Sequence, residues 1–144
     1  MANDGHVPVL RDEVLEVLDP RPGDVVADLT AGGGGHAAAL AQRIGPGGTL
    51  VLMDLDAGNL EQAAKRVVTI GPTVIELHGN FATAAAAVRA RHLQVNCVLA
   101  DLGFASTQMS DPNRGFSFAA DGPLDMRMDP SGAVTAANLV NDLP

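Results

Sequence analysis

Short apolar runs alternate with amphipathic or alanine-rich stretches along this chain of 144 residues. The apolar runs predict four buried strands, at 25–29, 49–53, 74–77 and 95–99. The stretches around them predict helices at 9–18, 36–44, 58–69, 82–91 and 133–141. Because strands that alternate with helices form βαβ units, the pattern predicts an α/β fold with a parallel sheet, one half of a doubly wound architecture.

Residues 111–130 do not fit this pattern. Prolines and glycines interrupt any helix or central strand there, yet the stretch carries phenylalanine, leucine and methionine. Such a long connection is usually functional or disordered, and its apolar content argues against disorder. We therefore expect a lid or binding loop, with Phe116 and Phe118 packed inward and Arg127 beside an acidic partner or a phosphate group.

Composition narrows the class of protein. Hydrophobic residues make up 47% of a chain long enough for one core, and no apolar run approaches a membrane span. The net charge of −8 argues against nonspecific nucleic-acid binding by the chain as a whole. Cys97 is the single cysteine, so we expect a buried apolar thiol without a disulfide. The N-terminus has no signal-peptide pattern, and a cytoplasmic location is expected.

Residues 28–36 place an aspartate and four glycines where the first strand should meet a helix. Ligands of open α/β sheets bind outside the carboxyl ends of the strands, and glycines let the backbone approach them closely. Gly32, Gly34 and Ala37 fit the pattern of a nicotinamide-cofactor site, with Asp54 downstream. Asp28 argues against a pyrophosphate and suits a ligand with positive charge, such as S-adenosylmethionine.

Acidic and aromatic residues follow the other strands. Asp54 can accept hydrogen bonds from ribose hydroxyls, whereas we expect Asp56 to be solvated or a helix cap. Phe81 could pack on an adenine ring or in the core. Asp101 could accept a hydrogen bond or a proton from an amine nucleophile, or cap a loop. His36 could cap the ligand loop or face solvent, and the scattered histidines indicate no metal site.

Several motifs together resemble one family, the bacterial 16S rRNA (cytosine-N4)-methyltransferases. They are HVPVL (6–10), GGGGH (32–36), HGNF (78–81), DLG (101–103) and RGFSF…DGPLDMRMDP (114–130). The resemblance implies a partial Rossmann-like class I methyltransferase fold and methyl transfer from S-adenosylmethionine to a cytidine amine of the small ribosomal subunit. It places cofactor contacts at Gly34, Gly35, His36, Asp54, Phe81, Asp101 and Gln108. We take Asp101 as the hypothetical catalytic base.

The chain also departs from the family. Residues 104–107 are Phe-Ala-Ser-Thr where the family has a serine- and proline-containing sequence, and Leu55 replaces an arginine. Family members are also longer. We expect residues 1–132 to be the N-terminal part of the cofactor-binding domain and 133–144 the start of an inserted helical domain.

Three functional hypotheses stay open at this point. The chain could be an rRNA methyltransferase seen whole or in part, an inactive or partner-dependent module that binds adenosylmethionine, or a nicotinamide-dependent enzyme. Asp28 and residues 114–130 disfavour the last. A half sheet that ends at residues 95–99 would leave an apolar edge, so we also expect poor solubility or oligomerisation of the isolated chain.

Overall fold

The computed structural model describes residues 8–142. His6 and Val7 of the HVPVL motif and the start of the chain lie outside the described residues. The chain divides into two compact units, residues 1–102 and 103–144, and each is described by itself. From the sequence we expect a boundary between residues 132 and 133, where an inserted helical domain would begin, and this boundary stays a prediction.

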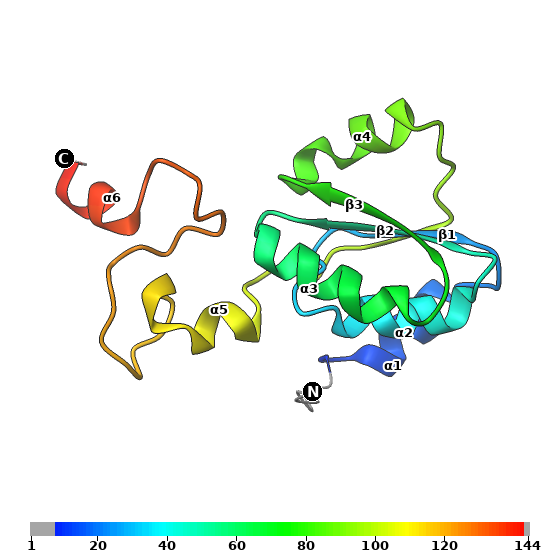
Figure 1. The fold of residues 1–144 in the computed structure, drawn as a ribbon, viewed down its shortest axis with the longest axis horizontal. Coiled ribbons are helices and arrows are strands. Elements are labelled where there is room, and N and C mark those ends of the chain that lie inside the picture. The colour runs from blue at the N-terminus through cyan, green and yellow to red at the C-terminus, as the bar shows by residue number, and fades with distance from the viewer. Residues whose placement is uncertain (1–7, 143–144) are drawn as a thin grey trace. The chain divides into compact units, whose positions relative to one another are not determined.

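The first unit is a four-stranded parallel sheet with flanking helices (Figure 1). In chain order, its elements are α1 (Arg11–Leu18), β1 (Val25–Asp28), α2 (Gly35–Ile44), β2 (Thr49–Asp54), α3 (Ala57–Val68), β3 (Thr73–His78), a 3-10 turn (Phe81–Thr83), α4 (Ala84–Ala90) and β4 (Cys97–Leu99). The strand order is β3-β2-β1-β4. The α/β fold with four parallel strands, predicted from the sequence, is confirmed.

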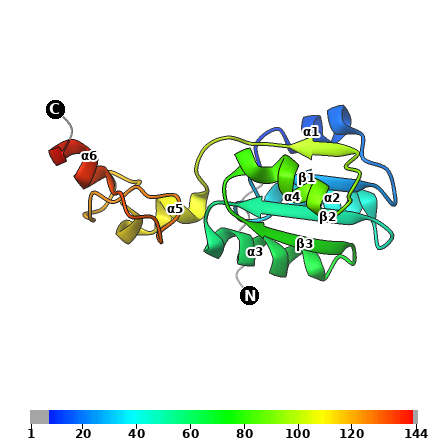
Figure 2. The same cartoon turned by 90° about the horizontal axis from the view of Figure 1, so that it is seen from above.

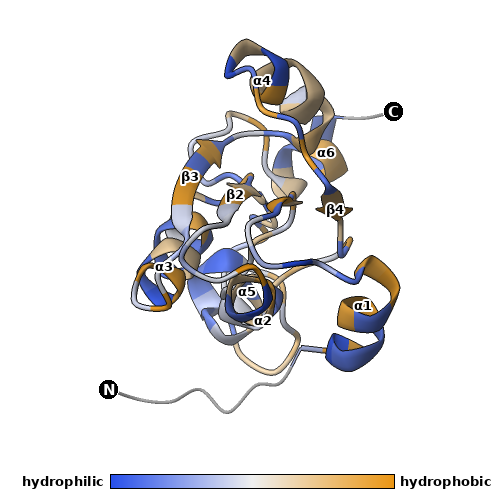
Figure 3. Ribbon diagram, turned by 90° about the vertical axis from the view of Figure 1, so that its right-hand side faces the viewer, coloured by the Kyte–Doolittle hydropathy of each residue, from blue (hydrophilic) through white to orange (hydrophobic). Residues whose placement is uncertain are grey.

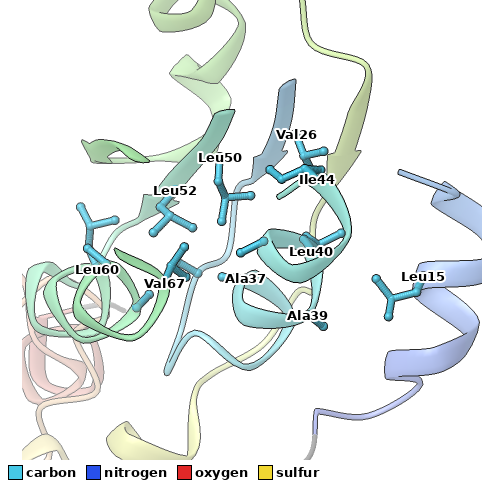
Figure 4. Close-up of a cluster of buried hydrophobic side chains, with 14 residues drawn as sticks. Leu15, Val26, Ala37, Ala39, Leu40, Ile44, Leu50, Leu52, Leu60 and Val67 are labelled. Atoms are coloured by element: carbon cyan, nitrogen blue, oxygen red, sulfur yellow. The ribbon is translucent and has the colours of Figure 1, made fainter. Parts of the chain in front are cut away.

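Two hydrophobic clusters fill the spaces on the two faces of the sheet. Leu50 and Leu52 of β2 join side chains of α1, α2 and α3 in the larger cluster (Figure 4). Val51 and Met53, which alternate with them, belong to the smaller cluster together with Ala84 and Ala87 of α4. Figure 2 shows α4 lying over this face of the sheet. This alternation follows from the two-residue period of a strand, and burial on both faces explains why β2 is an unbroken apolar run.

The helix α3 begins at a polar side chain that satisfies two of its free backbone N–H groups. Asp56 is the N-cap of α3, and its Oδ1 accepts hydrogen bonds from the backbone N–H groups of Gly58 and Asn59 at 2.9 and 3.3 Å. Because Asp56 is only 4% exposed, the helix-cap interpretation is confirmed and the solvated one is wrong.

Polar and apolar residues alternate around α1 and α3, as the hydropathy colouring shows (Figure 3). No helix within residues 8–142 is long and apolar enough to cross a membrane.

β4 forms one edge of the sheet in the described part of the chain, since β1 is its single neighbour. Val98, at its centre, is 53% exposed. Cys97 is partly buried against the larger cluster, and its Sγ donates to the carbonyl oxygen of Leu18 at 3.3 Å. The cysteine is therefore less enclosed than the sequence predicts, because an edge strand is covered by neighbours on fewer sides.

The second unit contains α5 (Ser106–Ser110), a 3-10 turn (Pro112–Arg114) and α6 (Ala136–Asp142), which are joined by a long ordered loop. Two arginines organise this loop. Arg114 donates to the carbonyl oxygens of Arg127 and Met128 at 2.8 and 3.0 Å. Arg127 binds both carboxylate oxygens of Asp125 and also donates to the carbonyl oxygen of Gly132 at 2.6 Å. The expected acidic partner of Arg127 is therefore Asp125.

The two loop phenylalanines differ from each other. The ring of Phe116 lies 5.5 Å from that of Phe104, and the Arg114 guanidinium lies 5.8 Å from its centre. Phe118 is fully exposed, so the expectation that it packs inward is wrong.

We expect Gly34→Ala to destabilise the protein by about 1–3 kcal/mol, because the residue has a left-handed φ of 78° and a side chain would meet the α3 backbone. An added Cβ would lie 2.8 Å from Cα of Ala63. Gly33→Ala is the matched control, since nothing lies within 4 Å of the added carbon. Urea unfolding of both variants measures the difference, and equal stabilities would contradict the packing argument.

The open edge of β4 generates a second expectation. The isolated chain should self-associate, and Val98→Lys should weaken the association by about tenfold or more, because a charged side chain on an edge strand disfavours strand pairing. Val68→Lys is the control, since Val68 is 61% exposed on α3. Sedimentation velocity at several concentrations gives the dissociation constants. If both variants associate equally, the β4 edge is not the cause.

Candidate functional site

Three carboxylates gather at the carboxyl ends of neighbouring strands. Asp28 ends β1, Asp54 ends β2 and Asp101 follows β4. Because β1 lies between β2 and β4, the three aspartates share one end of the sheet, and we call them the carboxylate edge. Their mutual repulsion is visible in Asp28, whose pKa is raised in part by the negative charges of Asp54 and Asp101.

The carboxylate edge also lies at the point where the strand order reverses. From β1 the chain proceeds to β2 and β3 on one side, and it then returns to β4 on the other side of β1. The loops that follow β1 and β4 flank this switch point. In open α/β sheets this is the position where ligands bind.

The glycine turn after β1 is fastened to both neighbouring strands. Its Leu29 N–H donates to the Leu99 carbonyl oxygen at 2.9 Å, and its Ala31 N–H donates to the Met53 carbonyl oxygen at 3.0 Å. The Gly32 N–H donates to Oδ2 of Asp54 at 2.7 Å. The turn is therefore shaped before any ligand arrives.

Asp54 holds two backbone groups at once. Besides the Gly32 bond, its Oδ1 accepts from the Asp56 N–H at 2.8 Å. A carboxylate offers about four acceptor positions, so each oxygen of this half-buried group can accept one more hydrogen bond. The side chain is thus fixed in orientation and still able to accept from a hydroxyl group.

Asp28 is completely buried, with 0% of its surface exposed. Its Oδ1 accepts from the Thr30 N–H at 3.1 Å, while Oδ2 has no hydrogen-bond partner. Burial is the main cause that raises the pKa of Asp28 to about 7. The group therefore holds a proton to much higher pH than an ordinary aspartate, whereas a charged carboxylate is expected from the sequence alone.

His36, in the first turn of α2, faces the carboxylate edge. Its Nε2 lies 3.6 Å from Oδ2 of Asp101, across the switch point. The histidine side chain is 10% exposed and the aspartate side chain 62% exposed. The solvent-facing interpretation of His36 is therefore wrong, and Asp101 keeps an accessible carboxylate beside a buried imidazole.

The remaining predicted residues lie in different surroundings. Phe81 follows β3 and is 48% exposed, so the alternative that it packs in the core is wrong. Gly34 and Gly35 form the start of α2. Gln108 belongs to the second unit, where it is buried and its Oε1 accepts from the Ala105 N–H at 2.8 Å. Its contact with a cofactor stays a prediction.

Two residues of the site escaped the sequence analysis. The Thr30 Oγ1 accepts from the Asp101 N–H at 2.7 Å, which ties the loop after β4 to the loop after β1. Arg66 of α3 donates to the Gly33 carbonyl oxygen at 3.3 Å. A hydroxyl residue two positions before a run of four glycines is a detectable signal, whereas the contact of Arg66 depends on how α3 packs. Within residues 8–142, no group of three or more histidine, cysteine or acidic side chains could hold a metal ion.

The sheet and its flanking helices define a Rossmann-like α/β fold, and the carboxylate edge is its candidate ligand site. A solved structure from Clostridium thermocellum, described as a candidate rRNA methylase, shares this fold with a TM-score of 0.57 at 18% identity, over 71% of this chain and 55% of that one. Residues 3–144 match the MraW methylase family, and the chain belongs to that family.

Curated relatives carry the name ribosomal RNA small subunit methyltransferase H. The protein of Syntrophotalea carbinolica is 45% identical over 96% of this chain and 44% of its own length. That of Pelobacter propionicus is 49% identical over 100% of this chain and 47% of its own length. The chain therefore spans less than half the length of these relatives.

The buried carboxyl group makes stability depend on pH. Because the pKa of Asp28 is about 7 in the folded protein and near 3.8 when exposed, the folded state keeps a proton that the unfolded state loses. We expect stability to fall as the pH rises from 4 to 7, by at most about 1.4 kcal/mol per pH unit from this group, and then to level off.

Asp28→Asn should remove this contribution, since asparagine does not titrate. Urea unfolding between pH 4 and 8 gives both profiles, and the difference between wild type and variant isolates Asp28 from the other titrating groups. Parallel profiles would show that the buried carboxyl group has an ordinary pKa.

Proposed function

We propose that this chain is the cofactor-binding part of an S-adenosylmethionine-dependent methyltransferase that modifies the exocyclic N4 of a cytidine in 16S rRNA. The observation that carries the proposal is the carboxylate edge with its fastened glycine turn, in a chain of the MraW methylase family. The small ribosomal subunit is then the partner, and the cytoplasm the expected location.

The residues present fit this cofactor. Space is open in front of Gly33, where an added Cβ would have no neighbour within 4 Å. The carboxylate edge supplies negative charge for a ligand with ammonium and sulfonium groups. Asp28 is enclosed behind this edge, so it can act on a bound ligand only through its charge. By contrast, the acidic edge would repel a pyrophosphate.

We assign the residue roles as follows. Gly34, Gly35 and His36 would line the amino-acid part of the cofactor at the start of α2. Asp54, held by two backbone amides, would accept from the ribose hydroxyls. The exposed ring of Phe81 would pack on the adenine. Asp101 would contact the cofactor beside the transferred group. Gln108, which belongs to the second unit, stays a predicted cofactor contact.

Methyl transfer then depends mainly on how the enzyme orients the cofactor and the amine, and it requires no covalent bond to the protein. When bound, S-adenosylmethionine supplies a methyl group on a positively charged sulfur. The accessible Asp101 carboxylate can accept a hydrogen bond from the attacking amine and take up its proton, and the His36 Nε2 lies 3.6 Å from its Oδ2. The target base must leave its stack to reach such a site. The loop at residues 111–130 stays a predicted lid.

Two other functions remain as outcomes of the tests. An inactive or partner-dependent module would bind the cofactor without transferring a methyl group. A nicotinamide-dependent enzyme would bind NAD, which membership of a methylase family and the acidic site disfavour. Because the chain has a net charge of −8, we expect most RNA contacts to come from local basic groups or from other parts of a longer protein.

Calorimetric titration distinguishes the cofactor classes. We expect the chain to bind S-adenosylhomocysteine and not NAD, because only the first lacks a pyrophosphate. Incubation with small ribosomal subunits and labelled S-adenosylmethionine then separates an enzyme from an inactive module. Binding of NAD alone would overturn the proposal, whereas cofactor binding without transfer would leave the inactive module.

The roles of two aspartates can be separated by substitution. Asp101→Asn should lower turnover by about a hundredfold or more, with a much smaller effect on cofactor affinity, because it removes the proton acceptor. Asp54→Asn should mainly weaken cofactor binding. Both variants are measured by calorimetry and single-turnover methyl transfer, and by the equivalent substitutions in a full-length relative if the chain alone is inactive. Unchanged turnover in Asp101→Asn would disprove its role as base.

A further inference from the structure

The buried Asp28 has a role in the site that the cofactor contacts leave unexplained. Its Oδ2 is enclosed and has no hydrogen-bond partner, although the residue ends the central strand β1. A buried polar atom without a partner costs folding free energy, so its retention calls for a reason. The carboxyl group lies between Asp54 and Asp101, the two residues placed against the cofactor.

Charged groups act on Asp28 from both neighbouring strands. Asp54 at the end of β2 and Asp101 after β4 both repel its negative form. His36 on α2 faces Asp101, and Arg66 on α3 binds the Gly33 carbonyl oxygen. Thr30 stabilises the negative form through its backbone and hydroxyl groups. Whether Asp28 carries a charge therefore depends on the charge that a ligand brings to this edge.

The cofactor and its product differ in the charge at the sulfur atom. S-adenosylmethionine has a positive sulfonium, and S-adenosylhomocysteine has a neutral thioether at the same atom. In a buried site the interaction between charges is much stronger than in water. A positive ligand favours loss of the Asp28 proton, and a neutral ligand does not.

We propose that Asp28 is a specificity residue that distinguishes the positively charged cofactor from its neutral product by releasing a proton when the first binds and taking one up when the second replaces it. The inference rests on the proposed function, since it assumes that this cofactor binds at the carboxylate edge. The proton is exchanged with solvent and no covalent bond changes. Product release is thereby favoured after each transfer.

The test compares two ligands at several pH values. Dissociation constants of S-adenosylmethionine and S-adenosylhomocysteine are measured by calorimetry between pH 5.5 and 8.5, in buffers of different ionisation enthalpy so that proton release is counted. In the wild type we expect the preference for the charged ligand to grow by about tenfold as the pH rises, because one unit of pKa difference between the complexes equals a factor of ten. In Asp28→Asn the preference should be independent of pH.

Thr30→Val provides a second variant that retains the carboxyl group. Loss of the hydroxyl removes a group that stabilises the negative form, so the pH at which the preference develops should rise. Proton release with the charged ligand should persist in this variant and be absent in Asp28→Asn.

Each outcome decides between the inference and the proposed function. If neither ligand binds the wild type, the proposed function fails and the inference fails with it. If both bind with a preference that does not change with pH, the inference is overturned and the function stands. A pH-dependent preference that persists in Asp28→Asn would assign the effect to other groups, His36 among them, and would also overturn the inference.

Discussion

The enclosure of β1 is the constraint on which the rest of the molecule depends. This strand is paired with β2 on one edge and β4 on the other, and side chains of both hydrophobic clusters cover its faces. Parallel strands buried in this way cannot hold polar side chains along their length. Polar groups are therefore found at the strand ends. Those of β1, β2 and β4 lie together at the point where the strand order reverses.

Asp28 shows what this enclosure does to a charged group. The residue continues the buried strand by one position, so its carboxyl group is desolvated, and its pKa rises to about 7. The same strand end carries Thr30, which bonds to Asp28 and to the loop after β4. One short segment thus fixes the glycine turn, aligns Asp101 and creates a group whose ionisation responds to nearby charge.

The second unit meets a different constraint. Its long loop has no sheet to satisfy the backbone, and the side chains of Arg114 and Arg127 supply donors to three carbonyl oxygens instead. Close packing of the chain against itself explains Gly122, where a Cβ would lie 2.1 Å from the Pro112 carbonyl oxygen. The arginines and glycines of this segment are thus explained by a loop that arginine side chains hold together and that packs closely against itself.

The local pattern of the chain was sufficient for the strands, for the helices of the first unit and for the placement of acidic residues at the strand ends. Apolar runs and glycine turns are local signals, and they determined the α/β class, the placement of Asp54 and Asp101 at strand ends, and the cap formed by Asp56. Tertiary structure decided the rest: the burial of Asp28, the approach of His36 to Asp101, the exposure of Phe81 and Phe118, and the contact of Gly34 with Ala63. These properties depend on which surfaces of distant segments meet, and no local pattern contains that information, because desolvation and packing are set by the neighbours that folding brings together.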